Sequence, residues 1–312
     1  MALVNPAITR DAVRRQLEGG RLDIAGLVFR VLLLLALVVS IGILVVLLVD
    51  VWTGGWPVLS TRFGDFMTGV LGSTPERSGV WQGIRGSFWI GIFTITLAFP
   101  LGIGAAIYLE EYAPHTRFSR IVDINIRNLA GVPSVVYGIL GLAIFVKTLG
   151  GITGGNTVLA AGITLAILVL PIVIITAAEA IRAVPSSLRE AGFGVGATRW
   201  EVVRHHVLPY AAPGILTGTV LALARALGEA APLILVGAVT GFLGGDRGNL
   251  FDIGQLTDRF TALPIVITTW AGRPQEGFRS LTSAGIIVLL AVVLLFNAAA
   301  ILLRNRFEKK RR

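Results

Sequence analysis

The sequence contains no cysteine and few charged residues. The missing thiols exclude disulfide bonds, cysteine-ligated zinc and thiol catalysis. Three histidines are present, and two of them, His205 and His206, are adjacent, so they point in different directions on a helix and disfavour a catalytic metal site. Charged residues make up 14% of the 312 residues, against about 25% in a soluble domain. With 54% hydrophobic residues, this is the composition of a membrane protein.

Long apolar runs take the place of the missing charge. Six of them are long enough to cross a hydrocarbon layer, which is about 30 Å thick and takes about 20 helical residues. None shows the alternation of a membrane β-barrel, so we expect helices. We place them near residues 27–49, 86–109, 128–149, 157–181, 211–239 and 282–303. The sequence therefore predicts an all-α integral membrane protein with six transmembrane helices.

The distribution of basic residues predicts the orientation. With both termini in the cytoplasm, 18 Lys and Arg residues lie in inside segments and 6 lie in outside loops, as the positive-inside rule requires. The polar, tryptophan-containing segments 50–83 and 240–281 should then face outward. The net charge of +9 follows from this topology, so nucleic-acid binding is not needed to explain it.

A polar island of 20 residues, 190–209, separates two of the apolar runs. The segments 187–190 and 198–201 both fit a capping box, in which a hydroxyl and a Glu carboxylate satisfy free backbone N–H groups. Pro209 is expected to end the second of two short helices. Between the boxes lie three residues that permit a sharp turn, Gly192, Gly194 and Gly196. A capped helical hairpin of this kind can be a simple connector or a docking element.

A charged pair lies inside the fifth apolar run. Arg225 and Glu229 are four residues apart, so they share one helical face and can form an ion pair. A central charge costs roughly 2.5–3.5 kcal/mol on insertion, and such residues usually face a cavity or a partner. The pair is therefore either a structural contact or a site where the Arg225 guanidinium binds an oxyanion while Glu229 holds it in place.

The polar island resembles the EAA signature of ABC importer permeases. The matching residues are Glu190, Ala191, Gly196, Leu208 and Pro209, while Gly192 replaces the second alanine of the signature. In that family the loop docks on the ATP-hydrolysing subunit, so the resemblance implies a docking role for these six residues. We call residues 186–209 the EAA-like loop. A Walker P-loop is absent from the sequence, so the chain is not itself expected to be the ATPase.

Three further runs, 131–138, 100–112 and 225–235, resemble the phosphate-specific permeases of ABC importers. The LEEY run at 109–112 and the LPIVI run at 263–267 are more similar to the PstA type than to the PstC type. The family motif residues are Gly131, Pro133 and Gly138. The resemblance implies a type I ABC importer (MetI-like) permease fold over residues 84–303. It also implies that Arg225 and Glu229 take part in uptake.

The resemblance implies the biochemical setting as well. The chain would be the permease subunit of a phosphate importer in the bacterial inner membrane, with a PstC-like permease, two PstB-like ATPases and an extracytoplasmic PstS-like binding protein. The ATPases would bind ATP and Mg, and this chain would carry no cofactor and no catalytic residue. Ser134 and Tyr137 are second-rank candidates for donating hydrogen bonds to a passing anion, or they only join helices.

The remaining expectations concern the chain ends and the rival functions. Residues 1–26 should form a cytosolic amphipathic arm before the first span, and residues 304–312 a basic cytosolic tail. A permease for sulphate or molybdate would use the same features. A membrane scaffold that signals without moving solute would need no anion site, and a secondary transporter would need no EAA-like loop.

Overall fold

The structure is a computed structural model that describes residues 24–114, 116–239, 250–251 and 253–309. Every element in these residues is helical, which confirms the all-α class. The longer helices are α2 (Ile24–Thr68), α3 (Trp81–Ile107), α4 (Arg117–Ala130), α5 (Ser134–Gly141), α7 (Val158–Arg182), α8 (Ser186–Gly194), α10 (Leu208–Gly228), α12 (Leu263–Ala271) and α13 (Glu276–Lys309). The shorter turns are η1 (Pro75–Arg77), η2 (Tyr108–Tyr112), η3 (Leu142–Thr148), α6 (Gly150–Thr153), α9 (Arg199–Val202), η4 (Val203–Val207), α11 (Ala231–Val236) and η5 (Ile253–Thr257).

The chain forms two compact units, residues 1–51 and 52–312, and α2 runs across the boundary between them. The described part of the first unit is apolar helix whose side chains are exposed almost throughout. It contains the first expected span, 27–49. The expected arm, 1–26, lies almost wholly outside the described residues.

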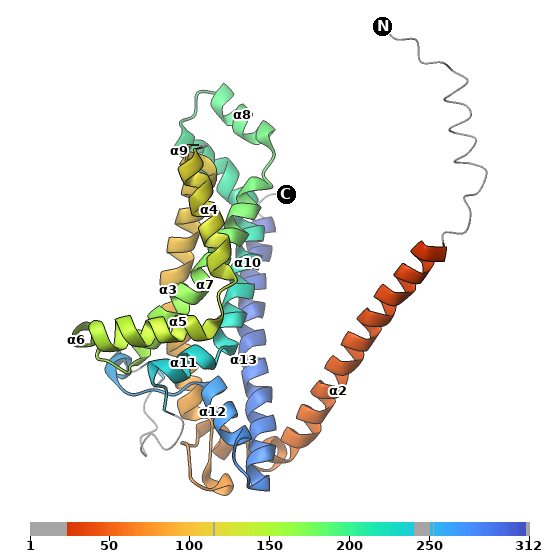
Figure 1. Cartoon of the computed structure of the whole chain (residues 1–312), viewed down its shortest axis with the longest axis vertical. Helices are drawn as coiled ribbons and strands as arrows, with labels where there is room; N and C mark the ends of the chain where they lie inside the picture. Colours follow the sequence, from red (N-terminus) through yellow and green to blue (C-terminus); the bar gives the residue numbers. More distant parts are fainter. Residues whose placement is uncertain (1–23, 115, 240–249, 252, 310–312) are drawn as a thin grey trace. The chain divides into compact units, whose positions relative to one another are not determined.

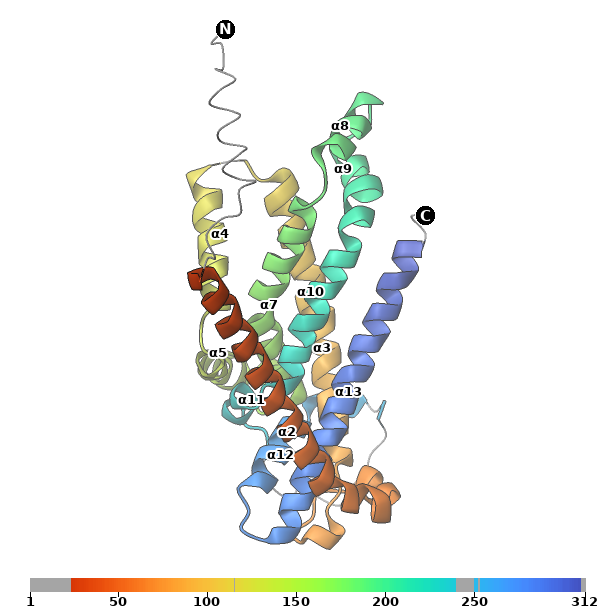
Figure 2. The ribbon, with the colours of Figure 1, turned by 90° about the vertical axis from the view of Figure 1, so that its right-hand side faces the viewer.

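Within the second unit, α3, α7, α10 and α13 run side by side as a bundle (Figures 1 and 2). Two glycines of α10 allow it to pack closely on α7. A Cβ on Gly218 would lie 2.3 Å from Thr176 Cβ, and one on Gly214 would lie 2.8 Å from Ala180 Cβ. This small-xxx-small pair on α10 thus meets small residues on α7, which lets the two helices approach closely.

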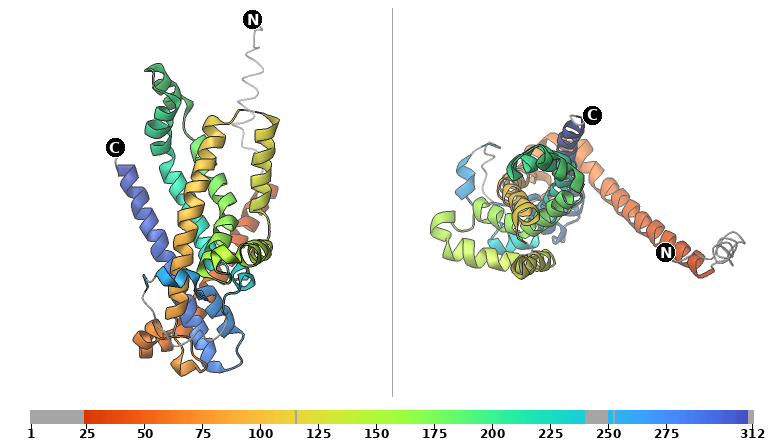
Figure 3. Two further views of the ribbon diagram at one scale, coloured as in Figure 1. Left: turned by 90° about the vertical axis from the view of Figure 1, so that its left-hand side faces the viewer. Right: turned by 90° about the horizontal axis from the view of Figure 1, so that it is seen from above.

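The third expected span, 128–149, is not one continuous helix. The chain bends by 98° between α4 and α5, so α5 lies across the bundle direction (Figures 1 and 3). Pro133 stands at the bend and cannot continue the α4 hydrogen-bond ladder. Five helices of the described chain are long and apolar enough to cross a membrane, or six if this bent pair counts as one span. The chain is therefore a multi-pass membrane protein.

The fifth expected span, 211–239, is also broken. α10 ends at Gly228, Glu229 adopts an extended backbone conformation, and α11 starts at Ala231. α11 packs against α5, and a Cβ on Gly138 would come within 2.7 Å of the Pro232 Cα. The two broken spans of the sequence thus meet in space, with Gly138 at their contact.

The two segments expected to be polar loops contain more helix than their composition suggests. In 50–83, α2 continues to Thr68. In 240–281, residues 240–249 and 252 are outside the described set, and α12 buries Leu263, Ile265 and Val266 against α3 and α13. The segment 240–281 thus combines polar residues with a short apolar helix, which is buried although it is too short to cross the membrane.

Candidate functional site

The EAA-like loop forms a helical hairpin that extends past the other described helices at one end of the bundle (Figures 1 and 2). α8 and α9 are its two helices, and Gly196 turns the chain between them with a φ of 84°. This left-handed conformation strains any residue with a Cβ. The predicted glycine hinge is confirmed, but only the first of the two helices is short, since α9 continues through η4 into α10.

One of the two predicted capping boxes forms. Thr198 accepts a hydrogen bond from the backbone N–H of Glu201, and the Glu201 carboxylate accepts one from the backbone N–H of Thr198 at 2.8 Å. This backbone hydrogen bond is the main reason that the pKa of the exposed Glu201 carboxyl is lowered, and the Thr198 hydroxyl adds to the effect. The box predicted at 187–190 does not form, because α8 already begins at Ser186, directly after Pro185.

The sequence predicted that Pro209 ends the second helix, and this prediction was wrong. The helix runs from α9 through the π-helical turn η4 into α10, and Pro209 lies in the first turn of α10. A π-helical turn adds one residue to the ladder, and such bulges often lie at functional sites. The hairpin is therefore continuous with the bundle helix α10.

The residues predicted to dock on an ATPase differ in their exposure to solvent. Glu190, Ala191, Gly196 and Pro209 are exposed, and Leu208 is half-buried. Gly192 is buried inside the hairpin, where a Cβ would lie 2.8 Å from Val202 Cγ2. The departure from the second alanine of the signature thus allows α8 to lie close to the following helix. A docking role for all six residues stays a prediction.

Sequence reasoning missed an apolar surface on this hairpin. Phe193, Val195 and Trp200 are 49%, 83% and 53% exposed. Exposed apolar patches often serve as interaction sites, so these three side chains are candidates for a contact with a partner. The signal was present in the sequence, since these three interrupt an otherwise polar island.

The charged pair Arg225 and Glu229 lies at the break between α10 and α11. Arg225 Nε is 3.4 Å from Glu229 Oε1, and the two side chains are 49% and 20% exposed. Arg225 is in the last turn of α10, where the helix dipole favours a cation. Irregular backbone at membrane depth is tolerated where it is buried in protein or lines a water-filled cavity. The predicted ion pair is confirmed, and the break gives it a setting that the sequence did not show.

The second-rank candidates lie at the other break. Tyr137 is buried, and its hydroxyl donates a hydrogen bond to the Leu129 carbonyl at 2.9 Å. This bond ties α5 to the end of α4 across the bend and uses the only hydrogen that the hydroxyl can donate. Ser134 is half-buried in the first turn of α5. The motif residues Gly131 and Pro133 form the bend itself.

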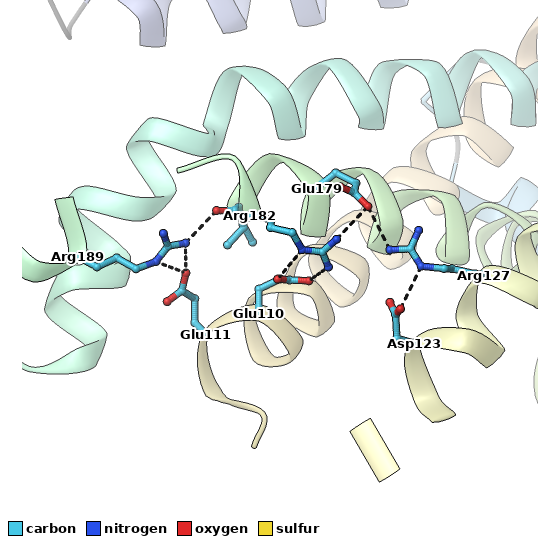
Figure 4. A network of polar contacts seen from close by, with 8 residues as sticks. Glu110, Glu111, Asp123, Arg127, Glu179, Arg182 and Arg189 are labelled. Atoms are coloured by element: carbon cyan, nitrogen blue, oxygen red, sulfur yellow. Dashed lines mark hydrogen bonds and ion pairs between the residues drawn. The ribbon is translucent and has the colours of Figure 1, made fainter. Parts of the chain in front are cut away.

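A network of ion pairs joins the helix ends near the EAA-like loop (Figure 4). Arg127 bonds to Asp123 and to Glu179, which connects α4 with α7. Arg182 bonds to Glu179 and to Glu110, which connects α7 with η2. The remaining pair, Arg189 with Glu111, connects α8 with η2. Sequence reasoning did not identify these pairs, because their members are up to 78 residues apart.

Comparison with known proteins identifies the family. The model of the binding-protein-dependent transport system inner membrane component family matches residues 98–312. The phosphate transport system permease protein PstA 1 of Mycobacterium tuberculosis is 33% identical over 279 residues, which cover 88% of this chain and 86% of that protein. PstA of Xylella fastidiosa is 32% identical over 78% of this chain and 81% of its own. A PstC protein of Mesorhizobium japonicum is 35% identical over 58% of this chain and 62% of its own.

Solved structures show the same fold at low identity. A bacterial alginate ABC transporter chain has a TM-score of 0.61 and 15% identity, with 93% of this chain and 94% of that chain covered. A chain of the methionine transporter MetNI in an inward-facing conformation has a TM-score of 0.53 and 19% identity, with 73% and 94% covered. The type I ABC importer permease fold that the sequence predicted is confirmed. The chain belongs to the binding-protein-dependent transport system inner membrane component family, and within it to the PstA-type permeases.

Proposed function

We propose that this chain is the PstA-type permease subunit of an ATP-driven phosphate importer in the bacterial inner membrane. The observation that carries the proposal is its 33% identity to a phosphate transport permease over 88% of the chain. The chain forms half of the transport route, and a PstC-like permease forms the other half. A PstS-like protein delivers phosphate from outside.

The route includes the break between α10 and α11. Arg225 is half exposed there, and its planar guanidinium can bind two oxygens of phosphate with parallel hydrogen bonds. Glu229 orients Arg225 and balances its charge when no anion is present. Charged side chains at membrane depth usually face a cavity or a partner, so water or a partner chain would supply the polar surroundings of this pair.

The EAA-like loop couples this route to ATP hydrolysis. Two PstB-like subunits bind ATP and Mg and hydrolyse ATP, and the apolar tip formed by Phe193, Val195 and Trp200 suits burial against one of them. In this proposal the loop and both termini lie in the cytoplasm, which the positive-inside rule favours for the basic residues near the loop.

Uptake measurements test the proposed substrate. Cells that lack their own phosphate, sulphate and molybdate importers would express this chain with its proposed partner subunits, and the uptake of each radiolabelled anion would be measured. We expect phosphate uptake that depends on ATP. Preferential uptake of sulphate or molybdate would reassign the substrate, ATP-independent uptake would support a secondary transporter, and no uptake with an intact complex would support a scaffold.

A further inference from the structure

Three consecutive residues of η2 hold three arginines from three successive elements. Glu110 pairs with Arg182 at the end of α7. The next two contacts reach into the EAA-like loop, from Glu111 to Arg189 of α8 and from the Tyr112 ring to the Arg199 guanidinium of α9, 5.3 Å from the ring centroid. Successive side chains of a helical turn leave its axis in different directions, so one short turn can reach all three neighbours.

The ion pair between Glu111 and Arg189 is largely buried, with side chains 8% and 23% exposed. Arg189 makes four hydrogen bonds. Its Nε and Nη2 donate to Glu111 Oε1 at 3.0 and 2.7 Å, while Nη1 donates to the Val184 carbonyl at 2.7 Å and Nη2 to the Ile181 carbonyl at 3.0 Å. These carbonyls lie at the end of α7, where helices leave carbonyls unsatisfied and favour a cation. Arg189 thus fixes the corner between α7 and α8 to η2.

α8 has few other attachments to the bundle. Gly192 is its one buried residue, and half-buried Leu188 packs against the core cluster that contains Ile181 and Val202. Apolar burial therefore holds α8 only in part. η2, in contrast, continues α3 without a break, and α3 packs along α7. Glu111 is therefore a direct contact between α8 and the continuous helix formed by α3 and η2.

We infer that Glu111 and Tyr112 form a socket that transmits movement of the EAA-like loop to α3, with Glu111–Arg189 as its main contact. The inference rests on the proposed function, since it concerns the loop that an ATPase would move. Glu111 and Arg189 are positioning residues: they contact neither phosphate nor nucleotide in this scheme. They determine how much of the loop's movement reaches the transport route.

The test compares Glu111→Ala with the matched control Glu110→Ala in the whole complex in proteoliposomes. The control removes the neighbouring ion pair between Glu110 and Arg182, which connects η2 with α7 and not with the EAA-like loop. The measured quantity is phosphate moved per ATP hydrolysed, together with the amount of ATPase that co-purifies. We expect Glu111→Ala to reduce the transport ratio at least fivefold while ATPase co-purification and ATP hydrolysis persist, and Glu110→Ala to leave the ratio close to wild type.

A cross-link provides the rescue. Because the chain has no cysteine, Glu111→Cys with Arg189→Cys introduces the two thiols of the chain. We expect the double variant to be uncoupled and a short dithiol-specific cross-linker to restore the ratio. An unchanged ratio in Glu111→Ala, an equal loss of hydrolysis and uptake, or no rescue on cross-linking would overturn the socket. A wild-type complex that moves no phosphate would instead refute the proposed function.

Discussion

Arg225 is the residue on which the proposed substrate depends most directly. It is half exposed at a helix end, and its partner Glu229 uses the Nε side of the guanidinium. The N–H groups on the two Nη atoms of Arg225 are then available to an anion. A lysine keeps the charge but cannot form two parallel hydrogen bonds in a fixed plane.

Substitution of Arg225 by lysine is therefore expected to weaken phosphate uptake. A charge-assisted hydrogen bond contributes roughly 1.5–3 kcal/mol, so the loss of one bond should raise the KM for phosphate about tenfold or more. Initial uptake rates across a phosphate titration would measure this. Arg259→Lys, an exposed arginine away from the break, is the matched control. If Arg225→Lys had the same KM for phosphate as the wild type, Arg225 would not bind phosphate, and its ion pair with Glu229 would be only a structural contact.

At the scale of elements, two broken helices define the inner arrangement of the permease. α5 and α11 each follow a break, and they pack against each other through Gly138. Helices interrupted at membrane depth form the solute sites of many transporters, because the free backbone groups and helix ends can face the solute. The close contact of α5 with α11 requires a residue without a side chain at position 138.

Gly138→Ala tests this contact. The new Cβ would lie 2.7 Å from the Pro232 Cα, so backbone must move, and overpacking of this kind costs about 1–3 kcal/mol. We expect a lower thermal unfolding midpoint of the purified complex and reduced uptake. Gly151→Ala is the control, since its Cβ would meet no atom within 4 Å. Equal midpoints in the two variants would show that α5 and α11 do not depend on their close approach.

At the scale of the whole molecule, the charge distribution predicts the direction of the chain in the membrane. The EAA-like loop extends from one end of the bundle, and α12 lies toward the other end (Figure 1). The positive-inside rule predicts that the loop end faces the cytoplasm, where ATP is available.

Thiol labelling tests this direction in a chain with no cysteine of its own. Arg117 and Asp258 are both exposed and lie in segments assigned to opposite sides. A membrane-impermeant maleimide should label Asp258→Cys in intact spheroplasts and Arg117→Cys after permeabilisation. The cysteine-free parent chain gives the background signal. The reverse pattern would invert the topology and separate the loop from cytoplasmic ATP.

Local features of the sequence were predicted well because each depends on neighbouring residues. Hydropathy identified the membrane helices, and Gly196 indicated the turn of the hairpin. Thr198 indicated the helix cap, and the four-residue spacing of Arg225 and Glu229 indicated their ion pair. The first capping box failed for an equally local reason, since Pro185 allowed α8 to start earlier than the serine pattern suggested.

The sequence by itself determined the helical class, the membrane spans and the signatures of the family. The tertiary structure decided where the third and fifth spans break, which face of the hairpin hides Gly192, and that Glu111 meets Arg189. Hydropathy and capping act over a few residues and can be read along the chain. Contacts between residues 78 positions apart depend on the path of the backbone between them, and that path follows from the packing of all the helices together.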